Sequence, residues 1–352
     1  VIYTEIWAIK GDFRRLSLTT FRFVGTMAPM SHAQQAQNPN VFFCKAYAKI
    51  NLTLDVLGRR ADGYHELATV IQAVDLYDTL CLTEIADAEV QLHCDQPELN
   101  RTDNLARQAA LLIRQHVQSR RGVLIELHKR IPMAAGLGGG SSDAAAVLLA
   151  LQQWWQLPLS TVDLLEIAAT LGSDVPFFLN GGLAFCEGRG ERVTPLAPHW
   201  PISMRWLLLL KPAIALSTAA VFGSLPASDY SDGTHSQAIR ANLAEGRELP
   251  PLHLHNGLER GVLERYPQVA TAKHDLLAAG ATLVRLSGSG PTLFAPFGDL
   301  AQASETLHTM QAGGYEVYLT RAIYPTTEDR CFSNEPGCKE NRLLWQNNFT
   351  TV

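Results

Sequence analysis

A glycine-rich stretch is the first place in this sequence where residue types and spacing point to chemistry. Residues 132–146 read PMAAGLGGGSSDAAA, and four of the five positions from Gly136 to Gly140 are glycine. Ordered glycine costs conformational entropy, so such a dense run indicates that another group approaches the backbone closely. The first N–H groups of a helix are unpaired and partially positive, and glycines in front of them admit an anion. The stretch therefore predicts a phosphate-binding loop, with a tight structural turn as the alternative.

Two common nucleotide-binding motifs do not fit this stretch. The P-loop motif requires Gly-Lys-Ser/Thr, and no lysine follows these glycines. The dinucleotide motif GxGxxG fails because its last glycine position, counted from Gly136, falls on Ser141. If the loop binds phosphate, it therefore belongs to a class other than these two.

The loop is expected to connect a strand to a helix. Residues 122–132 are expected to form a strand that ends at Pro132, and the helix is expected to begin near Ser141 or Ser142, which are good capping residues. A second strand is predicted by the strict alternation at 47–57, which is typical of a half-buried strand with Lys49 and Asn51 on its polar face. Strand-like runs are also expected near 66–75, 79–84, 206–210 and 315–323, and helices near 103–117, 161–171, 217–225, 257–265, 268–279 and 299–311.

Length and composition favour a globular α+β protein of two domains. The chain has 352 residues, with 47% hydrophobic and 18% charged residues. We expect domains at 41–198 and 199–325, a leader or disordered extension at 1–40 and a disordered tail at 326–352. The net charge is −5 without a basic stripe, which argues against a nucleic-acid partner. No apolar run approaches the ~20 residues of a membrane span, so no membrane contact is expected.

The cysteine pattern argues against a zinc site or a disulfide framework. The six cysteines show no CxxC pairing. A reducing compartment therefore fits best, and a Cys331–Cys338 pair is the alternative. Localisation is expected to be bacterial cytoplasm, or a plastid if the arginine-containing residues 1–40 are a transit peptide; Met27 or Met30 is an alternative start.

Four segments, in order along the chain, resemble motifs of the GHMP kinases. PMAAGLGGGSSDAA (132–145) is similar to their glycine loop, AKINLTLDVLGRRADGYHEL (48–67) to their first motif and RLSGSGPTLFA (285–295) to their third. Together with LGSDVPFFLNGGLAFCEGRGE (171–191), they resemble the branch that phosphorylates a cytidylyl-methylerythritol in the non-mevalonate isoprenoid pathway. The resemblance covers about residues 43–323. It implies a two-domain GHMP kinase fold, with an N-terminal domain like domain 2 of ribosomal protein S5 and a ferredoxin-like C-terminal domain.

The resemblance also implies an ATP site with Mg²⁺, whose protein ligands stay unassigned. The adenine side would include Asn104, Leu105 and Lys129, which otherwise read as a helix cap, a core leucine and a solvated lysine. The phosphates would lie on the loop, and Ser141 or Ser142 would be near the metal. The implied loop residues are Pro132, Met133, Ala134, Ala135, Gly136, Leu137, Gly138, Gly139, Gly140, Ser141 and Ser142.

Catalysis is implied for Lys49 and Asp174. A hydroxyl that attacks a γ-phosphoryl group must lose its proton, and Asp174 aligns with the aspartate that takes it. Lys49 would orient the nucleophile and offset developing charge. From the residues alone, Asp174 could equally be a turn residue and Lys49 a surface lysine.

The substrate pocket is implied for Asn51, Tyr64, His65, Thr218 and Phe222. Tyr64 and Phe222 would sandwich cytosine and His65 would bind its edge, although Phe222 alone reads as a core residue. Asn51 and Thr218 would help to place the hydroxyl.

The sequence departs from its relatives at four positions, and competing functions stay open. Ala134 and Ala135 stand where glycine is frequent, Asp143 where asparagine occurs and Gly182 where some members have histidine. The alternatives are a GHMP kinase for homoserine, mevalonate or a sugar, and a non-catalytic metabolite sensor. The intact Lys49 and Asp174 argue against the sensor. A weak homodimer is a further open alternative.

Overall fold

The computed structural model describes residues 41–197, 199–325 and 330–333, the last three as backbone only. All of them belong to one compact unit, residues 38–352. The expected leader, the alternative start methionines and Cys338 lie outside the described residues. Within the described ranges, every helix is too short or too polar to cross a bilayer.

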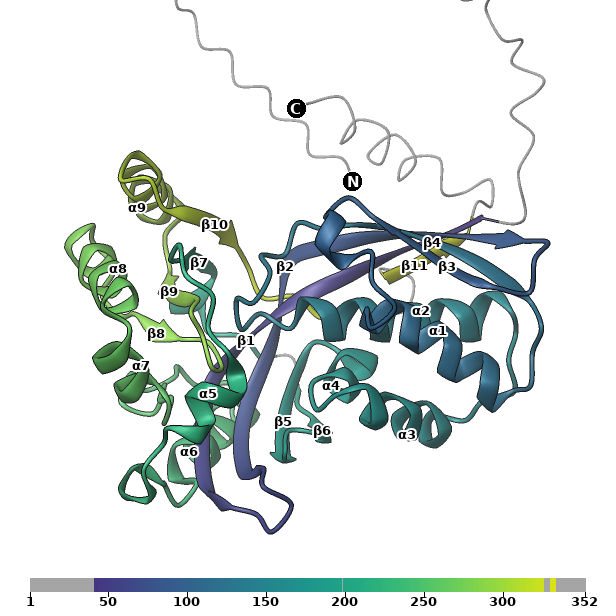
Figure 1. The fold of residues 1–352 in the computed structure, drawn as a ribbon. Helices are drawn as coiled ribbons and strands as arrows, with labels where there is room; N and C mark the ends of the chain where they lie inside the picture. Colours follow the sequence, from purple (N-terminus) through teal and green to yellow (C-terminus); the bar gives the residue numbers. More distant parts are fainter. Residues whose placement is uncertain (1–40, 198, 326–329, 334–352) are drawn as a thin grey trace, which may run out of the picture. The chain divides into compact units, whose positions relative to one another are not determined.

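The first sheet is built on a long antiparallel hairpin of β1 (Val41–Arg59) and β2 (His65–Ile85), with β11-β1-β2-β4-β3 as its main strand order. A parallel β3–α1–β4 crossover extends one edge, and β5 and β6 continue from the other end of β2. Helices α1 to α4 pack against this sheet (Figure 1). The remaining elements are β3 (Val90–Cys94), α1 (Leu105–His116), β4 (Gly122–His128), α2 (Gly139–Trp154), α3 (Thr161–Leu171), α4 (Val175–Asn180), β5 (Leu183–Gly188), β6 (Arg192–Pro195) and β11 (Cys331–Ser333).

The second sheet has the strand order β10-β7-β9-β8, with antiparallel neighbours throughout. In chain order this is strand, helices, strand, strand, helix, strand, which is the ferredoxin-like arrangement. This order confirms the ferredoxin-like arrangement predicted for the C-terminal half. Its elements are β7 (Trp206–Lys211), α5 (Thr218–Gly223), α6 (Thr234–Ala244), α7 (Glu259–Arg265), α8 (Pro267–Ala278), β8 (Arg285–Leu286), β9 (Leu293–Phe297), α9 (Leu300–Ala312) and β10 (Glu316–Thr320).

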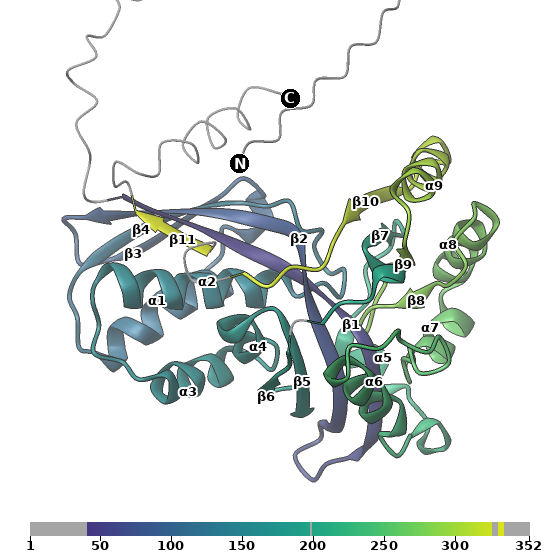
Figure 2. The same cartoon turned by 180° about the vertical axis from the view of Figure 1, so that it is seen from behind.

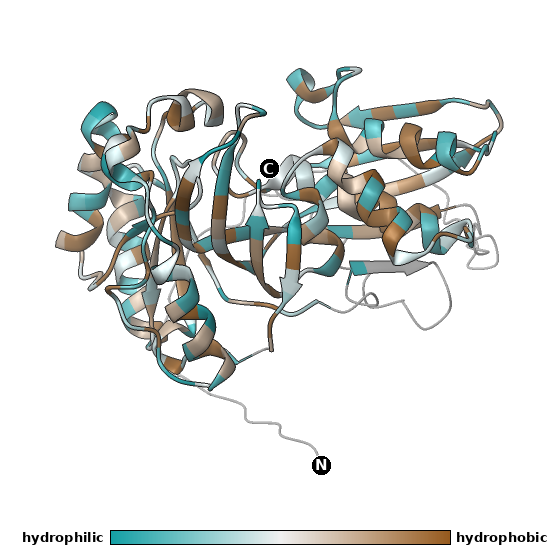
Figure 3. Ribbon diagram, turned by 90° about the horizontal axis from the view of Figure 1, so that it is seen from below, coloured by the Kyte–Doolittle hydropathy of each residue, from teal (hydrophilic) through white to brown (hydrophobic). Residues whose placement is uncertain are grey.

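Both halves share apolar packing around the β1–β2 hairpin. Leu54, Val56 and Leu67 of the hairpin pack with residues of the second sheet, and α6 lies against both of its strands. The helices carry both apolar and polar residues (Figure 3), as expected for elements with one buried face. The long hairpin therefore joins the two halves rather than belonging to one.

The strand predicted at 47–57 is confirmed as part of β1, but its predicted half-burial is wrong, because residues 48–56 are buried on both faces. Lys49 and Asn51 are each only 4% exposed. The backbone N–H of Lys49 donates to the carbonyl of Leu137 at 3.0 Å, and that of Asn51 to the Ser287 hydroxyl at 3.3 Å. The glycine loop and the segment before β9 thus cover the polar face of β1 and enclose its side chains.

The two strand-like runs expected at 66–75 and 79–84 are one strand, β2. The pairing register with β1 shifts between Tyr47 and Ala48, which is where the polar break in β2 lies. There the backbone N–H of Asp75 donates to the carbonyl of Arg321. A β-bulge therefore accommodates the break, and β2 continues through it. At the bulge, Asp75 pairs with Arg321 instead of with β1.

Three described elements were not expected from the sequence: β3, α4 and α6. The last of these lies in a segment that reads as polar and irregular. In addition, β11 falls within the predicted tail and pairs with β1, next to the chain that returns from β10 (Figure 2). Just before β11, the buried Arg330 guanidinium donates to the carbonyls of Phe178, Leu179 and Asn180 at the end of α4.

Candidate active site

One cavity of about 1240 Å³ connects the glycine loop, β1, β2, the start of α4 and α5. Of the residues predicted for the site, only Ser142 does not line it. The cavity therefore brings the predicted phosphate, catalytic and base-binding regions together.

The glycine loop passes into α2 two residues earlier than expected. The helix begins at Gly139, and its N-cap is Gly138 at φ +73°, without a side-chain capping bond. Ser141 and Ser142 are inside the helix, so their predicted capping role is wrong. The Ser142 hydroxyl donates to the Tyr47 carbonyl at 2.7 Å. This leaves Ser141, which lines the cavity, as the serine available to a ligand.

The glycines of the loop serve two different needs. A Cβ at Gly136 would lie 2.6 Å from the Ser287 carbonyl oxygen, and a Cβ at Gly138 would lie 2.7 Å from the Phe178 ring. Both glycines also have positive φ angles, which side chains disfavour. By contrast, a Cβ at Gly140 would meet only Leu105, at 3.7 Å. Close packing explains Gly136 and Gly138, whereas Gly140 keeps the helix N-terminus open to the cavity.

Lys49 and Asp174 face each other in this cavity. The Lys49 ammonium lies 3.6 Å from Oδ2 of Asp174, and their side chains are 5% and 36% exposed. Asp174 is the N-cap residue of α4, yet its carboxylate makes no capping bond. Its side chain is thus held toward the cavity instead of serving the helix, which disfavours the reading of Asp174 as a turn residue.

Asn51 holds the Lys49 side chain in place. Its Oδ1 accepts from Lys49 Nζ at 2.6 Å, and its Nδ2 donates to the Thr69 hydroxyl at 2.9 Å. Gly288 lies beside this pair, because a Cβ there would be 3.1 Å from Asn51 Oδ1 and 3.3 Å from Lys49 Nζ. The third motif thereby closes the site around the two side chains.

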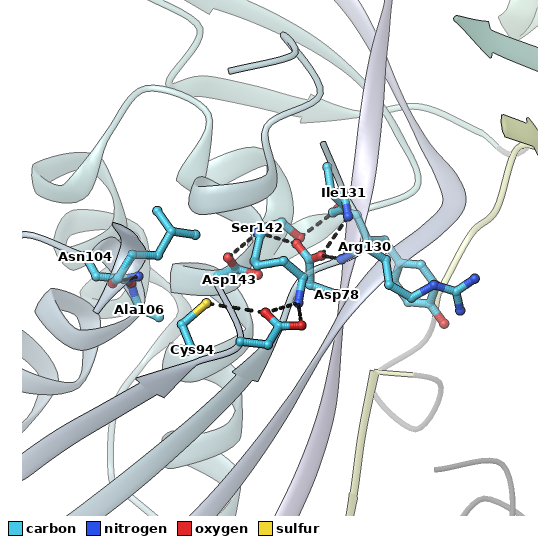
Figure 4. Close-up of polar contacts among 12 residues, drawn as sticks. Asp78, Cys94, Asn104, Ala106, Arg130, Ile131, Ser142 and Asp143 are labelled. Atoms are coloured by element: carbon cyan, nitrogen blue, oxygen red, sulfur yellow. Dashed lines mark hydrogen bonds and ion pairs between the residues drawn. The ribbon is translucent and has the colours of Figure 1, made fainter. Parts of the chain in front are cut away.

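Lys129 is buried between two aspartates, so the reading of a solvated lysine is wrong. Its ammonium lies 2.5 Å from Asp78 Oδ2 and 2.7 Å from Asp143 Oδ2. Oδ1 of Asp78 also accepts from the backbone N–H groups of Arg130 and Ile131. Figure 4 shows Asp78 and Asp143 converging beside the start of α2. The cluster ties the strand before the loop to β2 and α2.

The cluster of Lys129, Asp78 and Asp143 buries two carboxyl groups beside a single ammonium. Burial raises the pKa of the Asp143 carboxyl well above its usual value, and the nearby Asp78 carboxylate raises it further. Burial lowers the pKa of Lys129, but the carboxylates of Asp143 and Asp78 outweigh burial and raise it above the usual lysine value. Oδ1 of Asp143 is buried without a hydrogen-bond partner among the described residues. The charged form of Asp143 is therefore disfavoured at its position beside the phosphate region.

Asn104 caps α1 and also lines the cavity. Its Oδ1 accepts from the Ala106 N–H and its Nδ2 donates to the Leu99 carbonyl. The helix cap, one of the two readings of this residue, is confirmed. Leu105 is half-buried and lines the same wall.

The aromatic end of the cavity is formed by residues of β2, α5 and their neighbouring loops. The His65 and Phe222 rings are 5.4 Å apart, and Tyr230 packs edge-on to His65 at 6.0 Å. Tyr64 is 54% exposed, and the Arg189 guanidinium lies 5.0 Å above its ring. Burial, assisted by the charge of Arg59, lowers the pKa of His65, which favours a neutral imidazole at pH 7. Tyr64 and Phe222 both line the cavity, as Tyr230 does.

Sequence reasoning missed several residues of the site. Thr218 was predicted, but its hydroxyl partner Ser289 was not; the two oxygens are 2.9 Å apart. Ser289 lies in the third motif and Arg189 at the end of the segment 171–191, so both were within quoted motifs, whereas Tyr230 lies in a segment that reads as polar and irregular. The missed residues that line the cavity or hold its residues in place include Thr69, Asp78, Arg189, Tyr230, Ser287, Gly288 and Ser289.

Comparison with known proteins identifies the family. The model of the GHMP kinases N terminal domain matches residues 104–182, and that of the GHMP kinases C terminal domain matches residues 237–316. The 4-diphosphocytidyl-2-C-methyl-D-erythritol kinase of Alkaliphilus oremlandii is 38% identical over 288 residues, which is 81% of this chain and 98% of the relative. This chain belongs to the 4-diphosphocytidyl-2-C-methyl-D-erythritol kinase family. The enzyme of the same name from Shouchella clausii is 40% identical over 301 residues, covering 85% of this chain and 98% of that protein.

Solved structures agree with this family assignment. A crystal structure of 4-(cytidine 5'-diphospho)-2C-methyl-D-erythritol kinase matches with a TM-score of 0.68 and 35% identity, covering 80% of this chain and 98% of the other. Homoserine kinase from Cytophaga hutchinsonii has a TM-score of 0.64 at 20% identity, with 85% and 98% of the two chains covered. The latter likeness extends to the fold alone.

Proposed function

We propose that this chain is a kinase that transfers the γ-phosphoryl group of ATP to the 2-hydroxyl of 4-diphosphocytidyl-2-C-methyl-D-erythritol, a step of isoprenoid precursor synthesis. The observation that carries the proposal is the single cavity, in which the Lys49–Asp174 pair lies among residues of the glycine loop, His65 and Phe222. The family relatives support the same activity.

The phosphate end of the cavity is suited to ATP. The N-terminus of α2, with its open face at Gly140, offers unpaired N–H groups and a positive dipole end to the phosphates. Lys129 and Asn104 line the part of the cavity assigned to adenine. Mg²⁺ bound together with ATP would offset the negative charge of the phosphates. The Ser141 hydroxyl and the Asp143 and Asp174 carboxylates, all lining the cavity, are oxygen donors of the kind Mg²⁺ takes.

Asp174 and Lys49 divide the catalytic work. Asp174 accepts the proton of the attacking hydroxyl. Its carboxylate is available for this role because it makes no capping hydrogen bond to α4. Lys49 lies within 3.6 Å of that carboxylate and is almost fully enclosed, so its charge is weakly screened by water. Asn51 fixes the ammonium at 2.6 Å, which keeps the pair arranged before substrate binds.

The aromatic end of the cavity is suited to a cytosine base. Tyr64 and Phe222 provide faces for stacking, and a neutral His65 has one ring nitrogen to donate and one to accept a hydrogen bond. Homoserine, mevalonate and simple sugars have no planar base to use these groups. This end of the cavity therefore favours the cytidylyl substrate over those of other GHMP kinases.

The product of the reaction tests the proposal. Purified protein, ATP, Mg²⁺ and the cytidylyl substrate should yield ADP and a new phosphomonoester on the 2-hydroxyl, which ³¹P NMR resolves. Phosphate at a different hydroxyl, or release of inorganic phosphate without a phosphorylated product, would refute it. Omitting Mg²⁺ in a parallel sample should stop turnover.

A further inference from the structure

A cluster of histidines and one aspartate lies on the far stretch of β1, outside the active-site cavity. Asp55, His235 and His255 each place one potential ligand atom within 4.8 Å of the others. Asp55 belongs to β1, His235 to the first turn of α6, and His255 to the segment before α7. None of the three lines the cavity that holds Lys49 and Asp174. We propose that Asp55, His235 and His255 form a binding site for Zn²⁺ or a similar divalent transition metal.

The spacing of the ligand atoms suits a metal after small side-chain movements. An atom at the centre of a triangle with sides of 4.8 Å lies about 2.8 Å from each corner, while zinc takes nitrogen and oxygen ligands at about 2.0–2.2 Å. The side chains must therefore close by less than about 1 Å. The two histidines are half-buried, so the metal has access and solvent can supply a fourth ligand.

The charge of the cluster favours a cation. The Asp55 side chain is fully buried, and among the described residues its oxygens accept neutral hydrogen bonds alone, from the Ser231 hydroxyl at 2.7 Å and the Ser236 N–H at 2.8 Å. No lysine or arginine in the described parts of the chain forms an ion pair with it. Burying an uncompensated carboxylate is costly, and buried charges are normally paired or bound to a metal. A divalent ion beside Asp55 would compensate this charge.

The type and support of the ligands favour zinc over magnesium. Imidazole nitrogens suit zinc and similar metals, whereas magnesium prefers an all-oxygen shell. Nδ1 of His235 lies 3.3 Å from Nδ1 of His253, so a hydrogen bond between these two nitrogens leaves Nε2 of His235 for a metal. A hydrogen bond on the second ring nitrogen fixes the tautomer and orientation of a metal-binding histidine. The His235 and His255 ring centroids lie 4.2 Å apart at an interplanar angle of 25°, so the two rings are neighbours and one of them must turn for both to bind the same ion.

The backbone around the site is well anchored. The N–H of Leu54, next to Asp55, donates to the carbonyl of His255 at 2.8 Å. The side chain of the following Asn256 donates to the carbonyls of Leu286 and Gly288, in the segment that covers Asn51. A metal at this site would therefore fasten α6 and the 253–256 segment to β1. The proposal does not depend on the kinase activity.

Metal binding to the full chain tests the proposal. The protein is stripped with chelator, then titrated with Zn²⁺ or with Mg²⁺ in separate samples, while bound metal, affinity and melting temperature are measured. We expect one tightly bound Zn²⁺ per chain and a higher melting temperature with Zn²⁺, and no such shift with Mg²⁺ in the absence of ATP. His235→Asn and His255→Asn should each lower the Zn²⁺ affinity at least about tenfold.

Two further variants complete the test. His253→Asn should weaken binding by about 10- to 100-fold, as expected for a residue that orients a ligand. The exposed His308→Asn is the matched control and should bind as the parent does. Far-UV circular dichroism verifies that each variant is folded. Absence of a tight site in the parent, or equal affinity in the parent and in a folded His235→Asn/His255→Asn variant, would overturn the proposal.

Discussion

The Lys49 ammonium lies 3.6 Å from Oδ2 of Asp174, although one residue comes from β1 and the other from the start of α4. The separation leaves room for a substrate hydroxyl to approach the carboxylate while the lysine stays charged beside it. Lys49 also stays fixed by Asn51, so the arrangement exists before any ligand is bound. This pair is the catalytic centre of the proposed reaction.

Asp174→Asn should abolish most of the catalysis and leave ATP binding almost unchanged. The amide keeps the size of the side chain but cannot accept the hydroxyl proton, and general-base catalysis contributes ~10²–10⁴-fold. We expect kcat to fall by at least ~10²-fold. The control is Asp299→Asn at the N-cap of α9, where asparagine caps as well as aspartate. A kcat for Asp174→Asn within a few-fold of the control would contradict the assigned role.

Removing either aromatic ring should weaken the binding of the cytidylyl substrate but not the binding of ATP. Stacking of a base on an aromatic ring is worth ~1–3 kcal/mol, so Tyr64→Ala should raise its KM by roughly 5- to 150-fold. The KM for ATP and the melting temperature should hardly move, because Tyr64 is exposed. Phe222→Ala should raise the same KM. It should also lower the melting temperature somewhat, because Phe222 packs against the apolar residues of the second sheet. Equal losses for ATP and the cytidylyl substrate in Tyr64→Ala would argue against the base-binding assignment.

Two glycine variants should separate ATP binding from folding. Gly140→Val places a side chain where only Leu105 is near, so we expect the KM for ATP to rise at least about tenfold while the melting temperature stays close to the parent value. Gly138→Ala should instead lower the melting temperature, since its Cβ would collide with Phe178 and its φ is +73°. If Gly140→Val bound ATP normally, the N-terminus of α2 would not be the phosphate site.

The buried Asp143 should make stability depend on pH. Its folded-state pKa is raised above the usual value of 3.8, so the native state holds the proton more tightly than the unfolded chain does. This contribution to stability is present below about pH 4 and is lost as the pH rises through the folded-state pKa. Asp143→Asn removes the effect, since asparagine stays neutral. The melting temperature of Asp143→Asn minus that of the parent should therefore grow as the pH rises from about 4 and then level off.

The exposed Asp103→Asn provides the comparison for this pH experiment. Asp103 pairs with Arg101 at the surface, where such pairs contribute little. Its melting-temperature difference from the parent should change little over the same pH range. If the melting-temperature difference between Asp143→Asn and the parent were also independent of pH, burial would not disfavour the charged form of Asp143.

The motifs predicted most of the site, because motif residues lie close together in the chain. Lys49 and Asn51 share a face through the two-residue period of a strand, and the glycine stretch leads into a helix as expected, although α2 already begins at Gly139. The burial of that face was not predictable from the local alternation, since its cover comes from Ser287 and its neighbours, far along the chain. For the same reason Lys129 was singled out by the family resemblance, while its partners Asp78 and Asp143 were not predicted.

The histidine cluster shows the same limit. The cysteine spacing argued against a zinc site, and it bears only on ligand sets that are close in sequence. Asp55, His235 and His255 come from β1, α6 and the segment before α7, so only the packing of α6 on the hairpin brings them together. The alternation in β1 did place Asp55 on the same face as Lys49 and Asn51, but as an exposed residue, whereas the structure buries it completely.

The release of ADP with a panel of acceptors tests the central claim most directly. Purified protein is assayed with ATP and Mg²⁺ together with the cytidylyl substrate, homoserine, mevalonate or galactose, and the Asp174→Asn variant is run beside the parent. The account predicts rapid ADP release with the cytidylyl substrate alone and its loss by at least ~10²-fold in the variant. Turnover of one of the other acceptors at a higher kcat/KM, or ADP release that Asp174→Asn leaves unchanged, would contradict it.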